Sequence, residues 1–340
     1  MNTIQDQCIQ CWICHDHCLF LESFDVDPTH LELDAIPAEM AYACSLCGLC
    51  NEVCPEQIDL SCLFQARRKK AINAHEIEAD AYSYLFPDTS EHGIQRYREK
   101  HHIDYSDLKK EGSGTTAFFP GCTLLAYASD LTRAAYSALQ AQLGTIAFLE
   151  DCCGKVLYQF GLEKRARMFT QALQKRLEEQ GVERIITACP NCYYYLQDTL
   201  PGIKVDTIYQ ALPSHDAYLD RKATIHDSCP DRKDGIFAEQ VRKHLQACGL
   251  HMVEMEHAGA ETICCGSGGQ IRHFYEDFAE ELKNKRLEEA QTVQVDLMVC
   301  YCSSCLLNYN QFFHEHSIEV THALNLVLNQ HNDWLQVSKE

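Results

Sequence analysis

The chain has 340 residues, of which 29 are basic and 49 are acidic, and its formal net charge is −20. This charge argues against binding to nucleic acid or anionic lipid, since both need a basic surface. No apolar run approaches the ~18 residues of a membrane helix, so we expect no direct membrane span. The N-terminus also lacks the basic and then apolar pattern of a secretory signal, which predicts a cytoplasmic protein.

The 21 cysteines are the most informative part of the composition. Disulfide frameworks belong to short secreted chains, and this chain is long and carries no secretory signal. In a reducing cytosol, so many cysteines more often hold metal or carry out redox chemistry. Their spacing decides between these uses.

Two cysteine runs near the N-terminus share the spacing C-x2-C-x2-C-x3-C, and Pro55 follows the second run. This is the bacterial ferredoxin spacing for [4Fe–4S] cubanes, in which the fourth cysteine of each run ligates the other cluster. Zinc sites more often use pairs of C-x2-C, so the spacing favours iron–sulfur over zinc or free thiols. It predicts one cubane held by Cys8, Cys11, Cys14 and Cys54 and a second held by Cys44, Cys47, Cys50 and Cys18.

The segment between and after these runs is predicted to be helical, which gives a helical ferredoxin-type domain over residues 1–74. Its last helix carries the basic run 67–70, for which a solvated helix end is favoured over a docking patch. Residues 75–114 are polar and contain glycine and proline, and they predict a loosely packed helical linker.

Beyond the linker the chain repeats itself, with five cysteines in the order C…CCG…CxxC in each copy. In both copies, short β-rich apolar segments alternate with amphipathic helices, which predicts two parallel-sheet α/β domains over 115–220 and 221–340. The cysteines follow the strands, at the edge of such sheets where ligands bind. A buried structural cysteine pair and a zinc site are the alternatives at each copy.

The two sets, PGC…CCG…CPNC and HDSC…CCG…CSSC, resemble the cysteine-rich CCG domain of heterodisulfide reductase B-type subunits. The runs ahead of them resemble the C-type subunit, and their fusion resembles the D-type subunit of membrane-associated heterodisulfide reductases. The same order occurs in the C subunit of anaerobic glycerol-3-phosphate dehydrogenase. The likeness covers nearly all of the chain outside 75–114 and the C-terminal tail.

The resemblance implies a non-cubane [4Fe–4S] cluster at each five-cysteine set, with zinc possible in place of one of them. In electron-relay relatives one set is often incomplete, whereas both are complete here, which favours a disulfide-cleaving activity. Cys300 leaves the register of one ligand open, and Cys302 is chosen because it begins a CxxC. The implied ligands are Cys122, Cys152, Cys153, Cys189 and Cys192 at the first site, and Cys229, Cys264, Cys265, Cys302 and Cys305 at the second.

The leading hypothesis is an iron–sulfur oxidoreductase that passes electrons from the cubanes to the twin CCG clusters and reduces a small disulfide or a related sulfur bond there. The alternative is a non-catalytic relay between a flavoprotein dehydrogenase, of glycerol-3-phosphate or lactate type, and a quinone or cytochrome. The implied partner is a flavoprotein, a ferredoxin or a membrane cytochrome subunit, which would hold the chain at the inner face of the membrane in an anaerobic host.

Several other residues have a functional and a structural interpretation. His226, just before Cys229, is a candidate for proton supply or for hydrogen bonding to cluster sulfur, or is an ordinary residue at a strand end. We expect Cys62 and Cys248 to be structural, and the tyrosines at 193–195 to belong to the core or to shield the site. The final segment, ALNLVLNQHNDWLQ, is expected to pack on the protein rather than to dock a partner.

Overall fold

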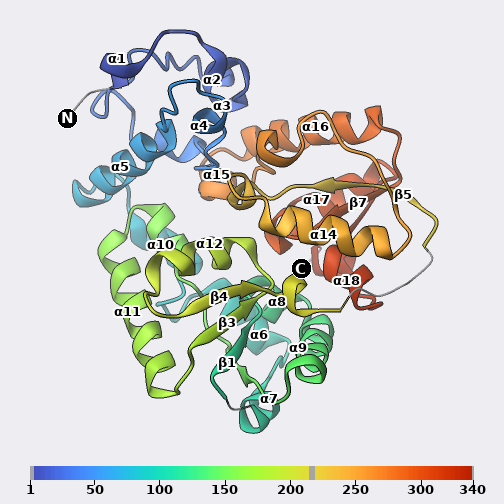
Figure 1. Ribbon diagram of the computed structural model, residues 1–340. Helices are drawn as coiled ribbons and strands as arrows, with labels where there is room; N and C mark the ends of the chain where they lie inside the picture. The colour runs from blue at the N-terminus through green and yellow to red at the C-terminus, as the bar shows by residue number, and fades with distance from the viewer. Residues whose placement is uncertain (1–3, 113, 214–218, 339–340) are drawn as a thin grey trace.

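The computed structural model describes residues 4–112, 114–213 and 219–338 (Figure 1). Within these residues a helical N-terminal part is followed by two parallel four-stranded sheets flanked by helices. This confirms the predicted fold class, a helical ferredoxin-type region followed by two repeated α/β units. In Figure 1 the N-terminal part lies beside the second unit, and the first unit lies below both.

The N-terminal part consists of short helices joined by the cysteine-containing loops. Its longest described helix, α5, begins where the Asp59 carboxylate accepts a hydrogen bond from the backbone N–H of Ser61. Phe20 and Phe64 are buried here together with Phe278 of the second unit, so this part shares a core with that unit. The elements are α1 (Ile4–Gln7), α2 (Ile13–Asp16), α3 (Leu19–Ser23), η1 (Met40–Ala43), α4 (Leu49–Glu52) and α5 (Leu60–Asn73).

Only half of the basic run on α5 is the solvated helix end that its charge predicts, since Lys69 and Lys70 are exposed. Arg67 and Arg68 are buried, and Arg68 is 0% exposed. The Arg68 guanidinium donates to the backbone carbonyls of Ala41 at 3.0 Å and Gln159 at 2.8 Å, and it lies over the ring of Tyr42. The expectation was wrong for these two arginines, because the partners of Arg68 are carbonyls of distant loops, which no local sequence pattern shows.

The linker is also packed more tightly than its polar composition predicts. Phe86 and Tyr105 are buried, and the Phe86 ring packs edge-on against Phe160 of the first unit. The Tyr105 hydroxyl donates to the carbonyl of Leu125 at 2.9 Å. A few aromatic side chains therefore anchor an otherwise polar segment. Its elements are η2 (Ala79–Leu85), α6 (Gly93–Lys100) and α7 (Ser106–Glu111).

The first sheet has the strand order β2-β1-β3-β4, and all of its neighbouring strands are parallel. The apolar segments that predict strands form β1 (Thr116–Phe119), β2 (Ala147–Phe148) and β3 (Arg184–Thr187), while β4 (Lys204–Thr207) was not predicted. The helices are α8 (Cys122–Tyr127), α9 (Ser129–Leu143), α10 (Lys155–Phe160), α11 (Glu163–Glu179), α12 (Pro190–Thr199) and α13 (Ile208–Ala211).

The second sheet repeats this order as β6-β5-β7-β8, again with parallel neighbours. Its register matches that of the first, since His226 pairs with Cys300 as Phe119 pairs with Thr187. Its strands are β5 (Lys222–His226), β6 (His251–Met252), β7 (Leu297–Cys300) and β8 (Glu319–His322). The helices are η3 (Cys229–Asp231), α14 (Ile236–Ala247), η4 (Gly259–Glu261), η5 (Gly268–Gln270), α15 (Ile271–Phe274), α16 (Glu276–Thr292), α17 (Ser303–Glu315), α18 (Ala323–Val327) and α19 (Trp334–Ser338).

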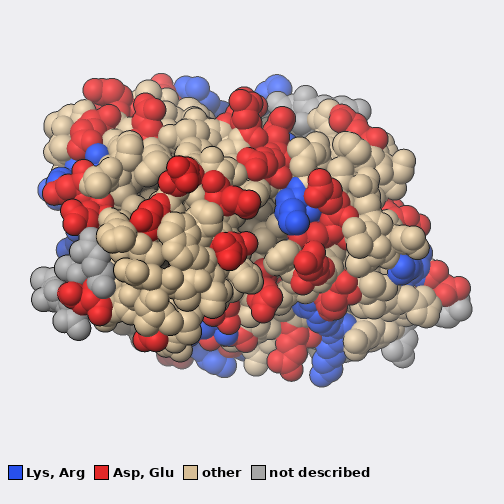
Figure 2. Space-filling model, turned by 90° about the horizontal axis from the view of Figure 1, so that it is seen from above, with Lys and Arg blue, Asp and Glu red and all other residues tan. Residues whose placement is uncertain are grey.

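The C-terminal segment packs on the protein, as expected. Trp334 is buried, and its indole N–H donates to the Asn325 side-chain oxygen at 2.9 Å. Figure 2 shows acidic side chains spread over the face seen from above, with fewer basic ones among them. None of the described helices has the length and apolar character needed to cross a membrane.

Candidate metal centres

The cysteines of both repeats lie where parallel strands end and helices begin. Cys122 starts α8 after β1, and Cys302 is the residue just before α17, after β7. The CCG loops turn at Gly154 and Gly266, whose φ angles of 80° and 83° favour glycine. Their backbone N–H groups donate to the sulfurs two residues earlier, each at 3.4 Å. The topology therefore directs the five thiols of each repeat to one end of its sheet.

The thiols of the two repeats contact one another in the same order. Hydrogen bonds between neighbouring thiols separate their pKa values, so that the pKa of Cys153 is lowered and the pKa of Cys192 is raised. The second repeat has an equivalent pattern of contacts. The order of contacts is Cys122, Cys152, Cys153, Cys192 and Cys189 in the first repeat, and Cys229, Cys264, Cys265, Cys305 and Cys302 in the second.

The ferredoxin-type thiols form two groups of four. Burial raises the pKa of Cys14 to about 11, and the negative charges of three neighbouring thiols add to the increase. Two of these thiols belong to the first run and one to the second. Burial and the charge of Cys47 raise the pKa of Cys18 to about 12. The neighbours of Cys14 are Cys54, Cys8 and Cys11, and those of Cys50 are Cys44, Cys47 and Cys18. These neighbours are the partners that the spacing predicts, and their role as ligands stays a prediction.

The donor sets fit iron–sulfur clusters. All of the cysteines lie in described residues and all are free thiols. Iron requires thiolates, whereas burial and mutual repulsion raise the pKa of Cys14, Cys18 and Cys50, so a bound cation is needed to hold these groups as anions. A cavity is lined by all four thiols of the first predicted cubane, Cys8, Cys11, Cys14 and Cys54.

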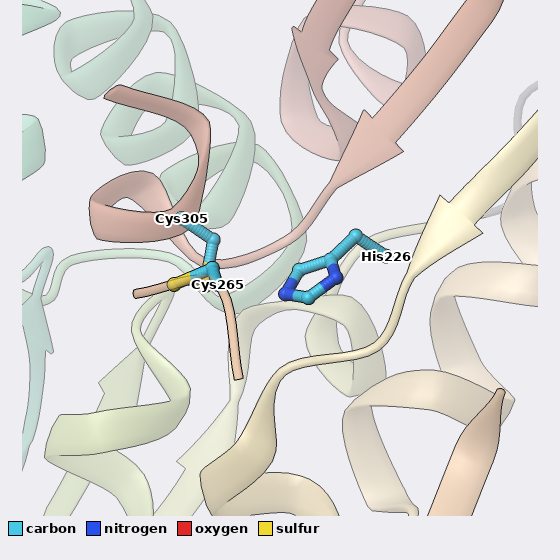
Figure 3. Close-up of side chains that lie close together, drawn as sticks. All are labelled: His226, Cys265 and Cys305. Atoms are coloured by element: carbon cyan, nitrogen blue, oxygen red, sulfur yellow. The ribbon is translucent and has the colours of Figure 1, made fainter. Parts of the chain in front are cut away.

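His226 belongs to the second CCG site. It ends β5, is 1% exposed, and has a ring nitrogen within 4.8 Å of the Cys265 and Cys305 sulfurs. Figure 3 shows the imidazole beside these two cysteines. Burial lowers its pKa to about 3, so the ring is neutral. The neighbouring Asp227 pairs instead with Arg242, with oxygen–nitrogen distances of 2.7 and 2.8 Å.

The remaining singled-out residues have mixed outcomes. Cys300 is buried at the end of β7, where burial and the charge of Cys302 raise its pKa. Cys248 is buried, as a structural residue should be, whereas Cys62 is exposed on α5 and its thiol donates to the Asp59 carboxylate at 3.2 Å. Tyr193 is buried in the core of the α/β units, as expected.

Sequence reasoning missed the residues that connect these centres. The Asn191 amide nitrogen lies 3.6 Å from the Cys302 sulfur, and Lys155 donates to the Asn191 oxygen at 2.8 Å. The Arg232 guanidinium donates to the carbonyl of Cys47 at 3.0 Å. Asn191 lies within a CxxC and Arg232 lies three residues after a cysteine, but neither motif specifies what the side chain contacts.

A large cleft opens beside the first CCG site. It has a volume of about 830 Å³, and Cys122 and Cys152 lie in its wall. The linker contributes another part of the wall, which includes His92, Arg98 and His102. The linker thus helps to shape the surroundings of the first site.

Comparison with known protein families places these centres in context. Residues 4–58 match the "4Fe-4S dicluster domain", and residues 116–197 and 223–310 match the "Cysteine-rich domain" called CCG. The two CCG matches together cover half of the chain.

Three curated relatives show the same likeness. The B subunit of the fumarate reductase (CoM/CoB) of Methanothermobacter marburgensis is 26% identical over 94% of this chain and 70% of its own length. The D subunit of the dihydromethanophenazine:CoB--CoM heterodisulfide reductase of Methanosarcina mazei is 24% identical over 78% of this chain and 71% of its own length. EtfAB:quinone oxidoreductase of Syntrophomonas wolfei is 27% identical over 48% of this chain and 26% of its own length. The chain belongs to the CCG cysteine-rich domain family, with a 4Fe-4S dicluster domain ahead of the CCG repeats, and is an iron–sulfur electron-transfer protein.

Proposed function

We propose that this chain accepts electrons at two ferredoxin-type cubanes, passes them to non-cubane clusters at the twin CCG sites, and reduces a disulfide or a related sulfur bond there. The observation that carries the proposal is that both five-thiol sets are complete and contact one another in the same order. Two relatives support it, since one is named as part of a heterodisulfide reductase and the other as part of a CoM/CoB fumarate reductase.

In this proposal each group of thiols holds the cluster that the sequence predicts for it, and the units correspond to residues 1–74, 115–220 and 221–340. When bound, the clusters supply single electrons and iron atoms with affinity for sulfur. The protein's own residues hold the thiols in order and bury part of them, while Cys122 and Cys152 line the open cleft. His226 is the neutral group placed to hydrogen-bond to sulfur at the second site.

The cleft beside Cys122 and Cys152 offers the access that a small substrate needs. Its two guanidinium groups are paired, Arg98 with Glu150 and Arg176 with Asp151. Glu99 and Asp104 add two further carboxylates, so the wall of the cleft is acidic. Reduction of a disulfide breaks one S–S bond and forms two thiols, and it consumes two electrons and two protons. The electrons come from the partner protein through the cubanes, and the protons come from solvent in the cleft.

The partner is proposed to be a flavoprotein, a ferredoxin or a membrane cytochrome subunit, which would hold a cytoplasmic chain at the membrane. The first cubane is the more accessible of the two, because Cys11 is exposed while Cys44 and Cys50 are buried. Ile9 and Trp12 beside it are 59% and 41% exposed. This rim is the place where a redox protein would approach the first cubane.

The test is metal analysis combined with an activity assay on anaerobically purified protein. The proposal expects about sixteen irons per chain, as many labile sulfides and no zinc. It also expects reduction of a panel of small disulfides with reduced methyl viologen as the donor. If instead about eight to twelve irons are found and zinc makes up the difference, a CCG site is structural and the catalytic proposal fails.

The second candidate is an electron relay without a substrate of its own. The likeness to EtfAB:quinone oxidoreductase favours it, since that name describes transfer to a quinone. A relay would contain its iron–sulfur clusters and exchange electrons with a flavoprotein, but it would reduce none of the disulfides. The same activity assay therefore separates the two candidates.

A further inference from the structure

The ferredoxin-type part contacts the second CCG site closely. The second cysteine run passes so near η5 that a Cβ atom added at Gly269 would lie 2.5 Å from the Cys44 carbonyl oxygen. The Ser45 hydroxyl donates to the Cys264 sulfur, and the charge of Cys47 raises the pKa of Cys229. The second predicted cubane and the second CCG site are therefore direct neighbours.

Arg232 lies in this junction. It follows Cys229 by three residues, is 7% exposed, and donates through Nε to the Cys47 carbonyl at 3.0 Å. Its other N–H groups donate to the carbonyls of Thr262, at 2.5 Å, and of Ala260. Among the described residues no carboxylate forms an ion pair with it. The junction thus contains a buried cation whose charge is not cancelled by a direct partner.

The first repeat has apolar residues at the equivalent positions. The strand register equates Phe119 with His226, and the third residue after the leading cysteine is Leu125 in one repeat and Arg232 in the other. Phe119 and Leu125 are buried, and neither carries a polar side-chain atom. The two sites therefore share their thiols and differ in what surrounds them.

The other charged groups near the second site have ion-pair or hydrogen-bond partners. Asp227 binds Arg242, and Glu289 binds both Arg286 and His257. Asp231 accepts hydrogen bonds from two tyrosine hydroxyls and two backbone N–H groups, and burial raises its pKa.

Lys155 is the cation beside the first site. Its charge lowers the pKa of Cys153, but its ammonium also donates to Asn191, which contacts Cys302 of the second site. Lys155 therefore places a cation at the first site, where the second repeat has Ser267, and Arg232 places one at the second, where the first repeat has Leu125.

We infer that electrons from the ferredoxin-type part reach the CCG pair at the second site, and that Arg232 raises the reduction potential of that site. This inference rests on the proposed cluster content. A buried cation and hydrogen bonds to sulfur stabilise the more negative, reduced state of a cluster and so raise its reduction potential. Arg232 acts through its charge and not by contact with a substrate. Its guanidinium donates to the backbone carbonyl of Cys47, in the loop that carries the ligands of the second predicted cubane.

The test is an EPR-monitored redox titration of the whole chain. The Cys122→Ser and Cys229→Ser variants, each lacking one proposed ligand, assign the two CCG signals. Arg232→Leu, which introduces the first repeat's residue, is expected to lower the reduced-to-oxidised ratio of that site at least tenfold at fixed potential, about 59 mV for a one-electron couple.

Arg232→Lys keeps the positive charge and is expected to leave the second-site reduction potential close to that of the unaltered protein. Leu125→Met is the matched change in the first repeat, and it is expected to shift the potential of neither CCG site. His226→Phe is an independent variant that is expected to lower the second-site potential without changing the adjacent cubane, even if Arg232→Leu fails to fold. The inference is overturned if both variants keep full iron and leave the second-site potential unchanged. An iron content of about eight to twelve in the unaltered protein would instead mean that the proposed function fails.

Discussion

The side-chain amide of Asn191 in the first CCG unit lies 3.6 Å from the sulfur of Cys302 in the second, and this contact joins the two candidate metal centres. Asn191 lies inside the first CxxC, and Cys302 begins the second. Lys155 fixes the amide by donating to its oxygen at 2.8 Å, so the nitrogen faces the sulfur. A change in charge at one centre can therefore affect the other through the side chain of Asn191.

Replacing Asn191 with leucine is expected to lower the reduction potential of the second CCG site. The variant removes a hydrogen-bond donor from the Cys302 sulfur, and such donors stabilise the reduced cluster. A redox titration followed by EPR measures the effect, and Asn191→Gln, which keeps the amide, is the control. An unchanged potential with full iron content would show that this hydrogen bond does not tune the site.

Replacing Gly269 with alanine is expected to slow electron transfer from the ferredoxin-type part to the CCG pair. The φ angle is +61°, and the new Cβ would lie 2.5 Å from the Cys44 carbonyl oxygen, so the two loops must separate. Gly144→Ala is the matched control, because its φ is +77° but no atom lies within 4 Å of the new Cβ. Both changes introduce backbone strain, on the order of 1–3 kcal/mol.

Stopped-flow reduction by methyl viologen distinguishes the separation of the two loops, which only Gly269→Ala causes, from the backbone strain that both variants share. Only Gly269→Ala is expected to slow the reduction of the CCG signals after the cubanes have been reduced. Equal rates in the two variants would show that the loop contact does not limit the transfer.

The sequence predicted the cysteine groups, the strands that precede them and the paired α/β units, because regular spacing and local periodicity determine those features. It did not predict Arg232, Arg68 or the packing of the linker. These depend on backbone carbonyls and aromatic rings that are far away in the sequence, such as the Cys47 carbonyl 185 residues before Arg232. Strand β4 was missed because two of its four residues, Lys204 and Asp206, are charged, which hides the apolar pattern of a strand.

Each predicted cubane takes its fourth ligand from the other cysteine run, and both the spacing and the contacts between thiols support this exchange. Cys54→Ala is expected to perturb the EPR signal of the first cubane, although Cys54 belongs to the second run, because its charge acts on Cys14. Cys62→Ala is the control, since Cys62 is an exposed thiol on the following helix. Its iron content and spectra should match those of the unaltered chain. Loss of the second cubane alone in Cys54→Ala would mean that each run holds its own cluster.

Arg68→Met is expected to destabilise the folded chain strongly, and more than it changes the clusters. The side chain is 0% exposed, and its guanidinium donates to the carbonyls of Ala41, Cys44 and Gln159, so the variant leaves three buried acceptors unpaired. Each unpaired buried group costs ~1–3 kcal/mol, so the free energy of unfolding should fall by at least about 3 kcal/mol.

Anaerobic denaturant unfolding measures this loss, with Arg96→Met, whose side chain is 60% exposed, as the control. Burial lowers the pKa of Arg68 to about 10, so the group is charged at neutral pH and its loss also removes a cation beside Cys44. The second cubane should then become harder to reduce in whatever fraction of the variant remains folded. A fully stable Arg68→Met chain would show that water replaces the guanidinium at these carbonyls, and that the tie between α5 and the first CCG unit is not required for folding.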